Sequence, residues 1–307
     1  MMSQIDPALR TFIVCHRDWG TLRVTGPERL QWLQGLLTCD VKSLSPGQAV
    51  YGLVLTKTGK ILSDVTVAVV EDSVFLSTAT GRGEVVCEHL DRLLVMEDAE
   101  IENVSADHGW LAALGPGAAS SACALSSAWP CATLSSEAES AGIVFVVPRP
   151  GLQAAAEVLV RLGGAETELL PDAEWDGIRI ALGLPRFGVD YDESHTPHQA
   201  ALEQVAVCWS KGCYVGQEAV YKQGTRGKTR SRLFAIEIAG DELPPPGTPV
   251  YAGTEQAVAG SITSAAIDPV SERRLAFARL KTAVVEAKQP LAVMGAPATL
   301  AAPDSAP

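Results

Sequence analysis

The sequence predicts an α+β fold that ends in a small β-barrel. Short runs of alternating apolar and polar residues predict strands in the N-terminal part. Apolar residues at helical spacing predict helices between those strands. From residue 233 the sequence changes to short strand-like runs separated by the turns PPPG and Asp268-Pro269, which is typical of a separate small barrel.

The first predicted unit is strand, strand, helix. Residues 11–15 (TFIVC) and 20–25 (GTLRVT) predict two strands joined by an exposed turn. Gly26-Pro27 then opens a helix, because proline is well tolerated in a first helical turn. Four leucines in this helix share one face: Leu30, Leu33, Leu36 and Leu37.

A hairpin and a second helix follow. Alternating runs at 49–55 and 61–70 flank the segment TKTGK at 56–60, whose glycine suits a hairpin connection. A strand at 73–78 and a helix near 82–95 complete the pattern.

The middle of the chain is less regular. Residues 115–142 are rich in Ala and Ser and predict a weakly specified helix and loops. A strand at 143–147 and a helix at 151–162 follow, and then a helix near 172–182 that Asp172 is expected to cap.

Composition limits the class of partner. The chain has 307 residues, no apolar run near the roughly 18 residues of a membrane span, and no basic and apolar leader at its start, so we expect a cytoplasmic monomer without membrane contact. A net charge of −12 opposes binding to a polyanionic backbone, so we expect no nucleic-acid partner. The seven cysteines include no CxxC pair and are expected to be reduced.

The stretch GVDYDESHTPH contains enough ligand types for a divalent cation. The alternative is a solvated turn, which we favour because spacing within a loop does not fix a coordination geometry. We therefore predict no metal site. The residues concerned are Asp190, Asp192, Glu193, His195 and His198.

Asp64 lies in an otherwise apolar run, ILSDVTVAVV. If it is buried, its carboxylate needs a partner or a ligand, because an unpaired buried charge costs several kcal/mol or more. If it lies on the solvated face of a hairpin, it needs neither. Alternation leaves the two interpretations equal.

Cys213 lies in the segment KGCYVGQE. Lys211 and the amide of Gly212 are positioned to favour a thiolate. Gly216 permits a close backbone approach, and Gln217 and Glu218 offer hydrogen-bonding groups. A buried structural cysteine remains slightly favoured at this level, because the sequence identifies no histidine base for Cys213.

Three segments together, RIALGLPRFGVDYDE, HTPHQAAL and KGCYVGQE, resemble the folate-binding YgfZ branch of the glycine-cleavage T-protein (GcvT) superfamily. The resemblance also includes VTGPERLQWLQGLLTCDV and TKTGKILSDV and covers most of residues 10–295. It implies a three-domain cloverleaf with two interwoven ferredoxin-like α/β domains and a C-terminal β-barrel. With the change in sequence at residue 233 and the composition of the tail APATLAAPDSAP, we expect a folate-binding region at 1–232, the barrel at 233–297 and a disordered tail at 298–307.

The resemblance also implies a cofactor and a role. The cofactor is tetrahydrofolate or a derivative, and the role is an accessory one in assembly or repair of iron–sulfur clusters, with client or assembly proteins as partners. Asp64 matches the aspartate beside the one-carbon unit in the T-proteins, and Cys213 is the implied reactive thiol. The expected folate-binding residues of the hairpin and the motif are Asp64, Lys211, Tyr214, Gln217 and Glu218. The glutamate tail of a folate suits cationic side chains, so Arg226, Lys228 and Arg230 in the run YKQGTRGKTRSR are candidates for it, with an exposed basic loop as an equal alternative.

The alternative function is a folate-dependent one-carbon transferase of aminomethyl type. Three departures from the T-proteins favour folate binding without that turnover. AGIVFVVPRPG stands near 141–151 in place of a GYTGEDGFE-like segment, Trp175 replaces an arginine, and Ala181 replaces a glutamate.

Overall fold

The computed structural model describes residues 10–115, 118, 131–134, 142–164, 167–226, 229–253 and 257–301. The chain divides into two compact units. The sheet unit contains the described residues of Ile5–Leu170 and Val205–Gln217, and the barrel unit contains those of Pro171–Gln204 and Glu218–Pro307. Each unit is described by itself below.

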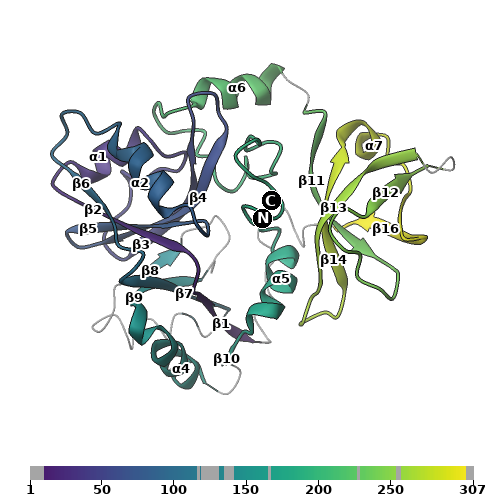
Figure 1. Cartoon of the computed structure of the whole chain (residues 1–307), viewed down its shortest axis with the longest axis horizontal. Coiled ribbons are helices and arrows are strands. Elements are labelled where there is room, and N and C mark those ends of the chain that lie inside the picture. Colours follow the sequence, from purple (N-terminus) through teal and green to yellow (C-terminus); the bar gives the residue numbers. More distant parts are fainter. Residues whose placement is uncertain are drawn as a thin grey trace. The chain divides into compact units, whose positions relative to one another are not determined.

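The sheet unit is built on one ten-stranded sheet, in the order β10-β1-β7-β9-β8-β3-β4-β5-β2-β6 (Figure 1). Only β1 with β10 and β3 with β8 pair in parallel among the described strands. The strands are β1 Thr11–His16, β2 Gly20–Thr25, β3 Gln48–Leu55, β4 Ile61–Val70, β5 Ser73–Thr78, β6 Glu100–Asn103, β7 His108–Leu114, β8 Cys131–Leu134, β9 Ile143–Pro148 and β10 Thr167–Leu169.

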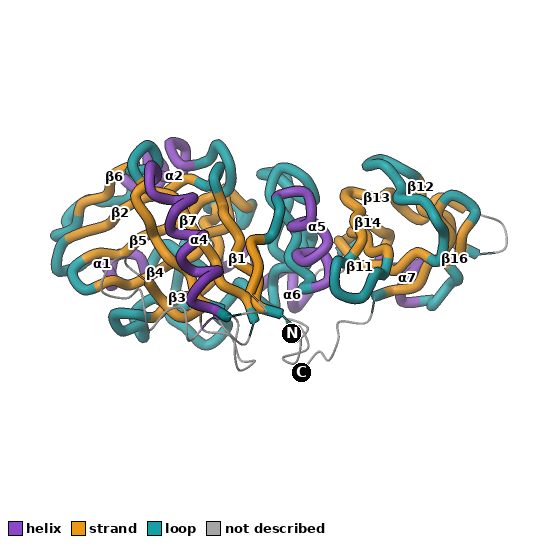
Figure 2. Tube along the Cα trace, turned by 90° about the horizontal axis from the view of Figure 1, so that it is seen from below, coloured by secondary structure: helices purple, strands orange, loops and turns teal. Residues whose placement is uncertain are grey.

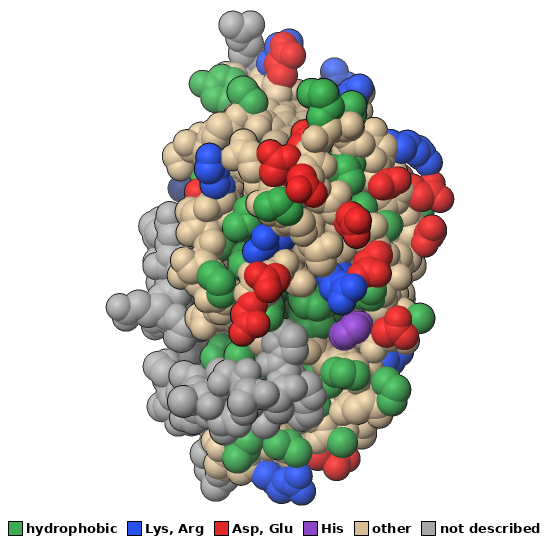
Figure 3. Space-filling view, turned by 90° about the vertical axis from the view of Figure 1, so that its left-hand side faces the viewer, with side chains coloured by type: hydrophobic (Ala, Val, Ile, Leu, Met, Phe, Trp, Pro, Cys, Tyr) green, Lys and Arg blue, Asp and Glu red, His purple; other side chains and the backbone are tan. Residues whose placement is uncertain are grey.

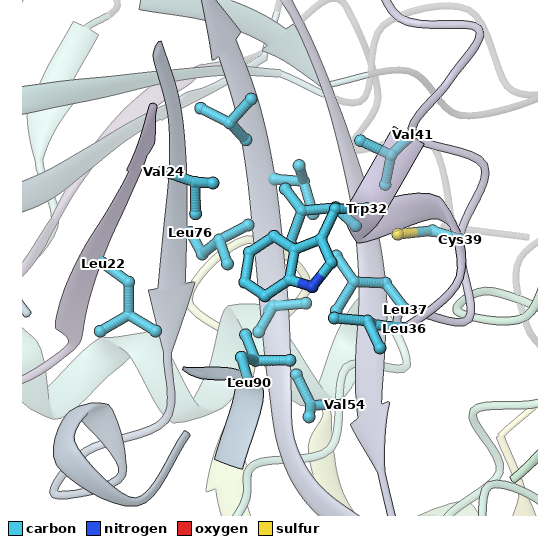
Figure 4. Packing of buried hydrophobic residues seen from close by; sticks show 14 of the residues in the cluster. Leu22, Val24, Trp32, Leu36, Leu37, Cys39, Val41, Val54, Leu76 and Leu90 are labelled. Atoms are coloured by element: carbon cyan, nitrogen blue, oxygen red, sulfur yellow. The ribbon is translucent and has the colours of Figure 1, made fainter. Parts of the chain in front are cut away.

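Helices α1 (Arg29–Gln34) and α2 (Gly83–Asp91) belong to the first core of this sheet. Trp32 lies at the centre of that core in Figure 4, surrounded by aliphatic side chains from both helices and from strands β2 to β5. Trp32 and Leu33 are buried, and each such side chain stabilises the fold by roughly 1.5–3 kcal/mol. This core fixes the position of the segment that leaves α1.

A second core lies under α4 (Leu152–Gly163), which follows the short 3-10 turn Arg149–Gly151. In Figure 2, α4 runs across strands β1 and β7. Its buried residues recur at helical spacing, which is why this segment forms an amphipathic helix. They are Leu152, Ala155, Ala156 and Leu159.

The barrel unit contains a closed barrel in the order β11-β14-β13-β12-β15-β16. Its strands are β11 Ser231–Ile238, β12 Pro249–Ala252, β13 Ala257–Ile267, β14 Arg274–Lys281, β15 Leu291–Val293 and β16 Ala296–Leu300. The helices are α5 Asp172–Ala181, α6 Gln217–Arg226 and α7 Thr282–Glu286. Helix α5 packs closely on β13 at Gly177, where a Cβ atom would lie 2.1 Å from the carbonyl oxygen of Ile267.

The predicted α+β class with a C-terminal barrel is confirmed. Helix α1 is shorter than predicted, because the chain turns after Gln34 and Leu37 forms an isolated bridge with Val54. Pro171 occupies the N-cap position of α5, so Asp172 is the first helical residue and not the predicted cap.

The predicted tail also needs a correction. β16 extends to Leu300 because its backbone pairs with β11, so residues 298–300 belong to the barrel. Residues 302–307 and most of the predicted helix and loops at 115–142 lie outside the described residues. Within that range the prediction is wrong for Cys131–Leu134, which forms strand β8 because its backbone pairs with β3 and β9. Among the described helices, none is both long and apolar enough to cross a membrane.

Candidate functional site

Asp64 lies on β4, and its neighbour on the same face of the sheet is Tyr51, which the sequence analysis did not identify. The pairing of β3 with β4 places Leu53 opposite Asp64 and Tyr51 opposite Thr66, so Tyr51 and Asp64 are diagonal neighbours on one face. The Tyr51 hydroxyl donates a hydrogen bond to Asp64 Oδ2 over 3.0 Å. Asp64 is half-buried, between the two alternatives that the sequence left open. The hairpin connection at 56–60 is the sequence signal that could have identified Tyr51, because it sets the register.

The segment with the KGCYVGQE motif is bonded to the residues that follow α1. The Cys208 amide donates to the Thr38 carbonyl over 2.9 Å, and the Val215 amide donates to the Gly35 carbonyl over 3.1 Å. Thr38 Oγ1 donates to the Ala206 carbonyl over 2.5 Å. Both ends of the segment are therefore fixed within the sheet unit.

Lys211 lies inside this contact. Its ammonium donates hydrogen bonds to the carbonyl oxygens of Gln34, Leu37 and Cys39, each over 2.7 Å. Burial lowers the pKa of Lys211, and the nearby Cys39 and Asp40 oppose that shift.

Tyr214 packs beside Lys211, with the ammonium nitrogen 5.4 Å from the centre of its ring. Burial raises the pKa of the Tyr214 phenol to about 12, with Cys208 adding to the shift. The side chain of Tyr214 is buried, so the neutral ring contributes packing to the motif.

Gly216 joins the motif to the hairpin that carries Asp64. Its φ of +84° is unfavourable for any residue with a side chain. A Cβ atom there would lie 2.6 Å from the Thr56 carbonyl oxygen and 3.3 Å from the Cα of Gly59. The motif residues Lys211–Gln217 and Asp64 therefore belong to neighbouring parts of the sheet unit, linked through the β3–β4 turn.

Cys213 is exposed, as is Gly212 beside it. Its position contradicts the buried structural role that the sequence slightly favoured. Two other thiols close to the motif are less exposed than Cys213. Cys39 is buried in the first core, and burial raises the pKa of its thiol to about 12, while Cys208 is half-buried.

The remaining predicted folate-binding residues belong to α6 and to the connection between α6 and β11. Gln217 begins α6 and is half-buried. The Glu218 side chain is 82% exposed and forms an ion pair with Lys222 over 2.6 Å. Arg230 is exposed. The side chain of Arg226, and Lys228, lie outside the described part of the chain.

GVDYDESHTPH forms two different environments in the barrel unit. Asp190 is buried and accepts hydrogen bonds from Arg179 over 2.7 Å, from Ser264 over 2.7 Å and from Thr263 over 2.5 Å. The predicted solvated turn is therefore wrong for Asp190, because its carboxylate pairs with a buried guanidinium. Asp192 and Glu193 are exposed.

His195 Nδ1 lies 2.7 Å from Asp192 Oδ1 in the same stretch. The hydroxyl and amide of Ser194 donate to that carboxylate, and these bonds lower the pKa of Asp192. Within the described ranges, no three His, Cys, Asp or Glu side chains are grouped so as to hold a metal ion.

One face of the molecule carries charges of both signs in its described part. Figure 3 shows the side of the molecule that is on the left in Figure 1. Acidic and basic side chains are interspersed over the coloured part of that face, with apolar side chains between them. This face offers no continuous basic surface to a polyanion in its described part.

Comparisons with known proteins agree with the fold. Residues 16–137 match the model of the GCVT N-terminal domain. The chain is 24% identical over 294 residues to an aminomethyltransferase of Listeria monocytogenes, covering 89% of this chain and 79% of that protein. It is 27% identical over 282 residues to an aminomethyltransferase of Rubrobacter xylanophilus, covering 84% of this chain and 73% of that protein.

A solved structure is similar over nearly the whole chain. The glycine cleavage system aminomethyltransferase T from Bartonella henselae superposes with a TM-score of 0.78 at 18% identity, covering 96% of this chain and 86% of that one. At this identity the likeness establishes the fold. The domain match and the curated relatives support a similarity of this chain to the GcvT-like superfamily.

Proposed function

We propose that this protein binds tetrahydrofolate or a derivative and supports the assembly or repair of iron–sulfur clusters in client proteins, as a member of the YgfZ branch. The observation that carries the proposal is the exposure of Cys213 within a motif in which Lys211, Tyr214 and Gly216 are held by neighbouring residues. Lys211 and Tyr214 on either side are held by hydrogen bonds and burial, so the segment presents one thiol to solvent.

The residues around Asp64 suit a pterin. A pterin ring carries N–H and amino donors for which a carboxylate is the matching acceptor, and an aromatic side chain can stack on it. Tyr51 and Asp64 provide both groups on one face of the sheet. Arg226 and Arg230 are the proposed contacts for the glutamate tail, on charge alone.

The proposed role of each site residue is limited to its own chemistry. Asp64 binds and orients the pterin, and Tyr51 holds the Asp64 carboxylate in place. Cys213 offers a sulfur ligand or nucleophile to a client, as an exposed thiol can in its thiolate form. Bound folate would supply or accept a one-carbon unit.

Three variants test the proposal: Cys213→Ala, Asp64→Ala and Cys208→Ala. Each variant is expressed in cells that lack the wild-type protein, where the activity of cluster-dependent enzymes is measured. Tetrahydrofolate binding by each purified variant is measured by calorimetry. We expect Cys213→Ala to lose support but keep folate affinity, Asp64→Ala to lose both, and the neighbouring half-buried thiol variant Cys208→Ala to keep both. Full support by Cys213→Ala would exclude the thiol role.

The second candidate is a folate-dependent one-carbon transferase of aminomethyl type. The position of Asp64 on the β3–β4 hairpin and the aminomethyltransferase relatives favour it. Incubation with methylenetetrahydrofolate or methyltetrahydrofolate and candidate acceptors separates the two. Stoichiometric binding without product supports the accessory role, and multiple turnovers support the transferase.

A further inference from the structure

Five backbone carbonyls between Gln34, the last residue of α1, and Cys39 accept hydrogen bonds from the segment Cys208–Val215. The carbonyls of Gln34 and of the C-cap residue Gly35 end the helix, where carbonyl groups lack a partner within the helix and need donors from elsewhere. Here the Val215 amide donates to the Gly35 carbonyl and the Cys208 amide donates to the Thr38 carbonyl. The Lys211 ammonium donates to three more carbonyls, those of Gln34, Leu37 and Cys39.

The three bonds from Lys211 use its whole donor capacity. An ammonium group has three N–H donors and no acceptor, and each of the three bonds is 2.7 Å long. This geometry leaves no N–H of Lys211 for a folate carboxylate or for the Cys213 thiolate. The lysine of the motif thus has a different task from the one that its charge suggests.

We infer that Lys211 is a positioning residue: its ammonium fixes the Cys213 loop on the segment that leaves α1, and so determines where the thiol is presented. The inference assigns a role within the proposed function and rests on it for its biological meaning. The hydrogen-bond geometry that carries the inference is independent of that function.

Two other residues of the motif also fix the Cys213 loop. Tyr214 is buried beside the ammonium, and Gly216 lies against the β3–β4 turn. Cys213 therefore lies between Lys211 on one side and the pair of Tyr214 and Gly216 on the other. Its exposure is a consequence of two fixed flanks and not of a free loop end.

Arginine distinguishes positioning from electrostatic activation. Lys211→Arg keeps the positive charge but replaces three directional N–H groups on one nitrogen by a planar fork, which cannot point at the same three carbonyls. Lys211→Met removes the charge and the donors at similar length. If the charge of Lys211 determines the behaviour of the Cys213 loop, Lys211→Arg should behave like wild type and Lys211→Met should not. If the three hydrogen bonds determine it, both variants should lose the fixed loop.

The experiment measures amide hydrogen exchange of Val205–Gln217 and the pH dependence of Cys213 alkylation by iodoacetamide, resolved by mass spectrometry, in the full-length protein. We expect exchange in this segment to rise about tenfold or more in both variants, as for the loss of hydrogen bonds from a charged donor. The pH dependence of alkylation stays the same. Lys222→Met, which removes an exposed lysine of α6, changes neither.

Exchange in β7 provides the internal reference for folding, since its residues lie in the sheet interior. Wild-type exchange in Lys211→Arg, or alkylation of Lys211→Met that requires higher pH, would overturn the inference in favour of an activating cation. Neither readout needs folate or a client, so failure of the proposed function in the cellular assay leaves this result independent.

Discussion

The Tyr51 hydroxyl donates to Asp64 Oδ2 over 3.0 Å, across the strand pair β3–β4. The bond lies within one hairpin, so the carboxylate is oriented by its own strand neighbour before any ligand arrives. Orientation in advance lowers the free-energy cost of binding, because fewer side-chain rotamers are lost when the ligand binds.

A double-mutant cycle tests this relationship. We expect Tyr51→Phe to weaken tetrahydrofolate binding about tenfold, in line with one hydrogen bond to a charged group. Asp64→Ala should weaken it more. In the Asp64→Ala background, Tyr51→Phe should have almost no further effect, because its partner is gone. Calorimetric titration gives the four affinities, and Tyr221→Phe, at an exposed tyrosine of α6, is the control. Equal effects of Tyr51→Phe in both backgrounds would contradict the coupling.

The two glycines of KGCYVGQE are expected to respond differently to alanine. At Gly216 the left-handed backbone and the close Thr56 carbonyl both oppose a side chain, so Gly216→Ala should lower the free energy of unfolding by about 1–3 kcal/mol. At Gly212 a Cβ atom would meet nothing within 4 Å, and Gly212→Ala should stay within about 0.5 kcal/mol of wild type. Urea unfolding measures both. Similar losses in the two variants would refute the close approach at Gly216.

Asp190 is expected to be the most sensitive acid of the barrel unit. Removing its side chain leaves the guanidinium of Arg179, which is 1% exposed, without this partner. Loss of one member of a buried ion pair destabilises by about 3–5 kcal/mol, so Asp190→Ala should lower the unfolding free energy by that order. Glu88→Ala removes an acid paired with Arg92 on the surface and should cost less than about 1 kcal/mol. A loss below about 1 kcal/mol for Asp190→Ala would contradict this prediction and show that the residues around Arg179 rearrange to compensate for the missing carboxylate.

Much of the fold was predictable because local patterns match the final elements. β4 occupies the predicted range of residues 61–70 because apolar residues alternate there, and the predicted hairpin has its turn at Thr56–Lys60. Of the strands in the sheet, β6, β7, β8 and β10 were not predicted. β7 is buried almost throughout its length, so its sequence, HGWLAAL, has no alternation to reveal it. β10 has only three residues, and its pairing with β1 connects positions far apart in the chain.

The site was less predictable than the fold. Residue types identified Asp64 and Cys213 as candidates, but burial decided between their alternatives, and burial depends on distant segments. Lys211 shows the limit of sequence analysis, because its charge suggested an activating or ligand-binding cation. Its three acceptors are backbone carbonyls about 175 positions earlier in the chain, and rules based on local sequence patterns do not reach contacts at that separation. Asp190 shows the reverse, because a polar stretch typical of a solvated turn contains a buried ion pair.

His16 is expected to make the sheet unit sensitive to acid. It ends β1 and stacks on Trp19, with ring centres 3.7 Å apart, and burial lowers the pKa of its imidazole to about 3. At pH values between that pKa and the ordinary histidine pKa of 6.5, the unfolded chain binds a proton that the folded chain does not. The free energy of unfolding therefore falls as pH falls through this window, by about 1.4 kcal/mol per pH unit.

From pH 6.5 to pH 5 this linkage removes about 2 kcal/mol from the free energy of unfolding. His16→Phe keeps a planar ring against Trp19 but has no proton to bind, so the loss between these two pH values should be smaller in the variant by that amount. Urea unfolding of both proteins at each pH measures the difference, and comparing slopes removes any constant change in packing. Parallel acid dependence in wild type and variant would mean that His16 is protonated in the folded protein, and that its environment admits a charge.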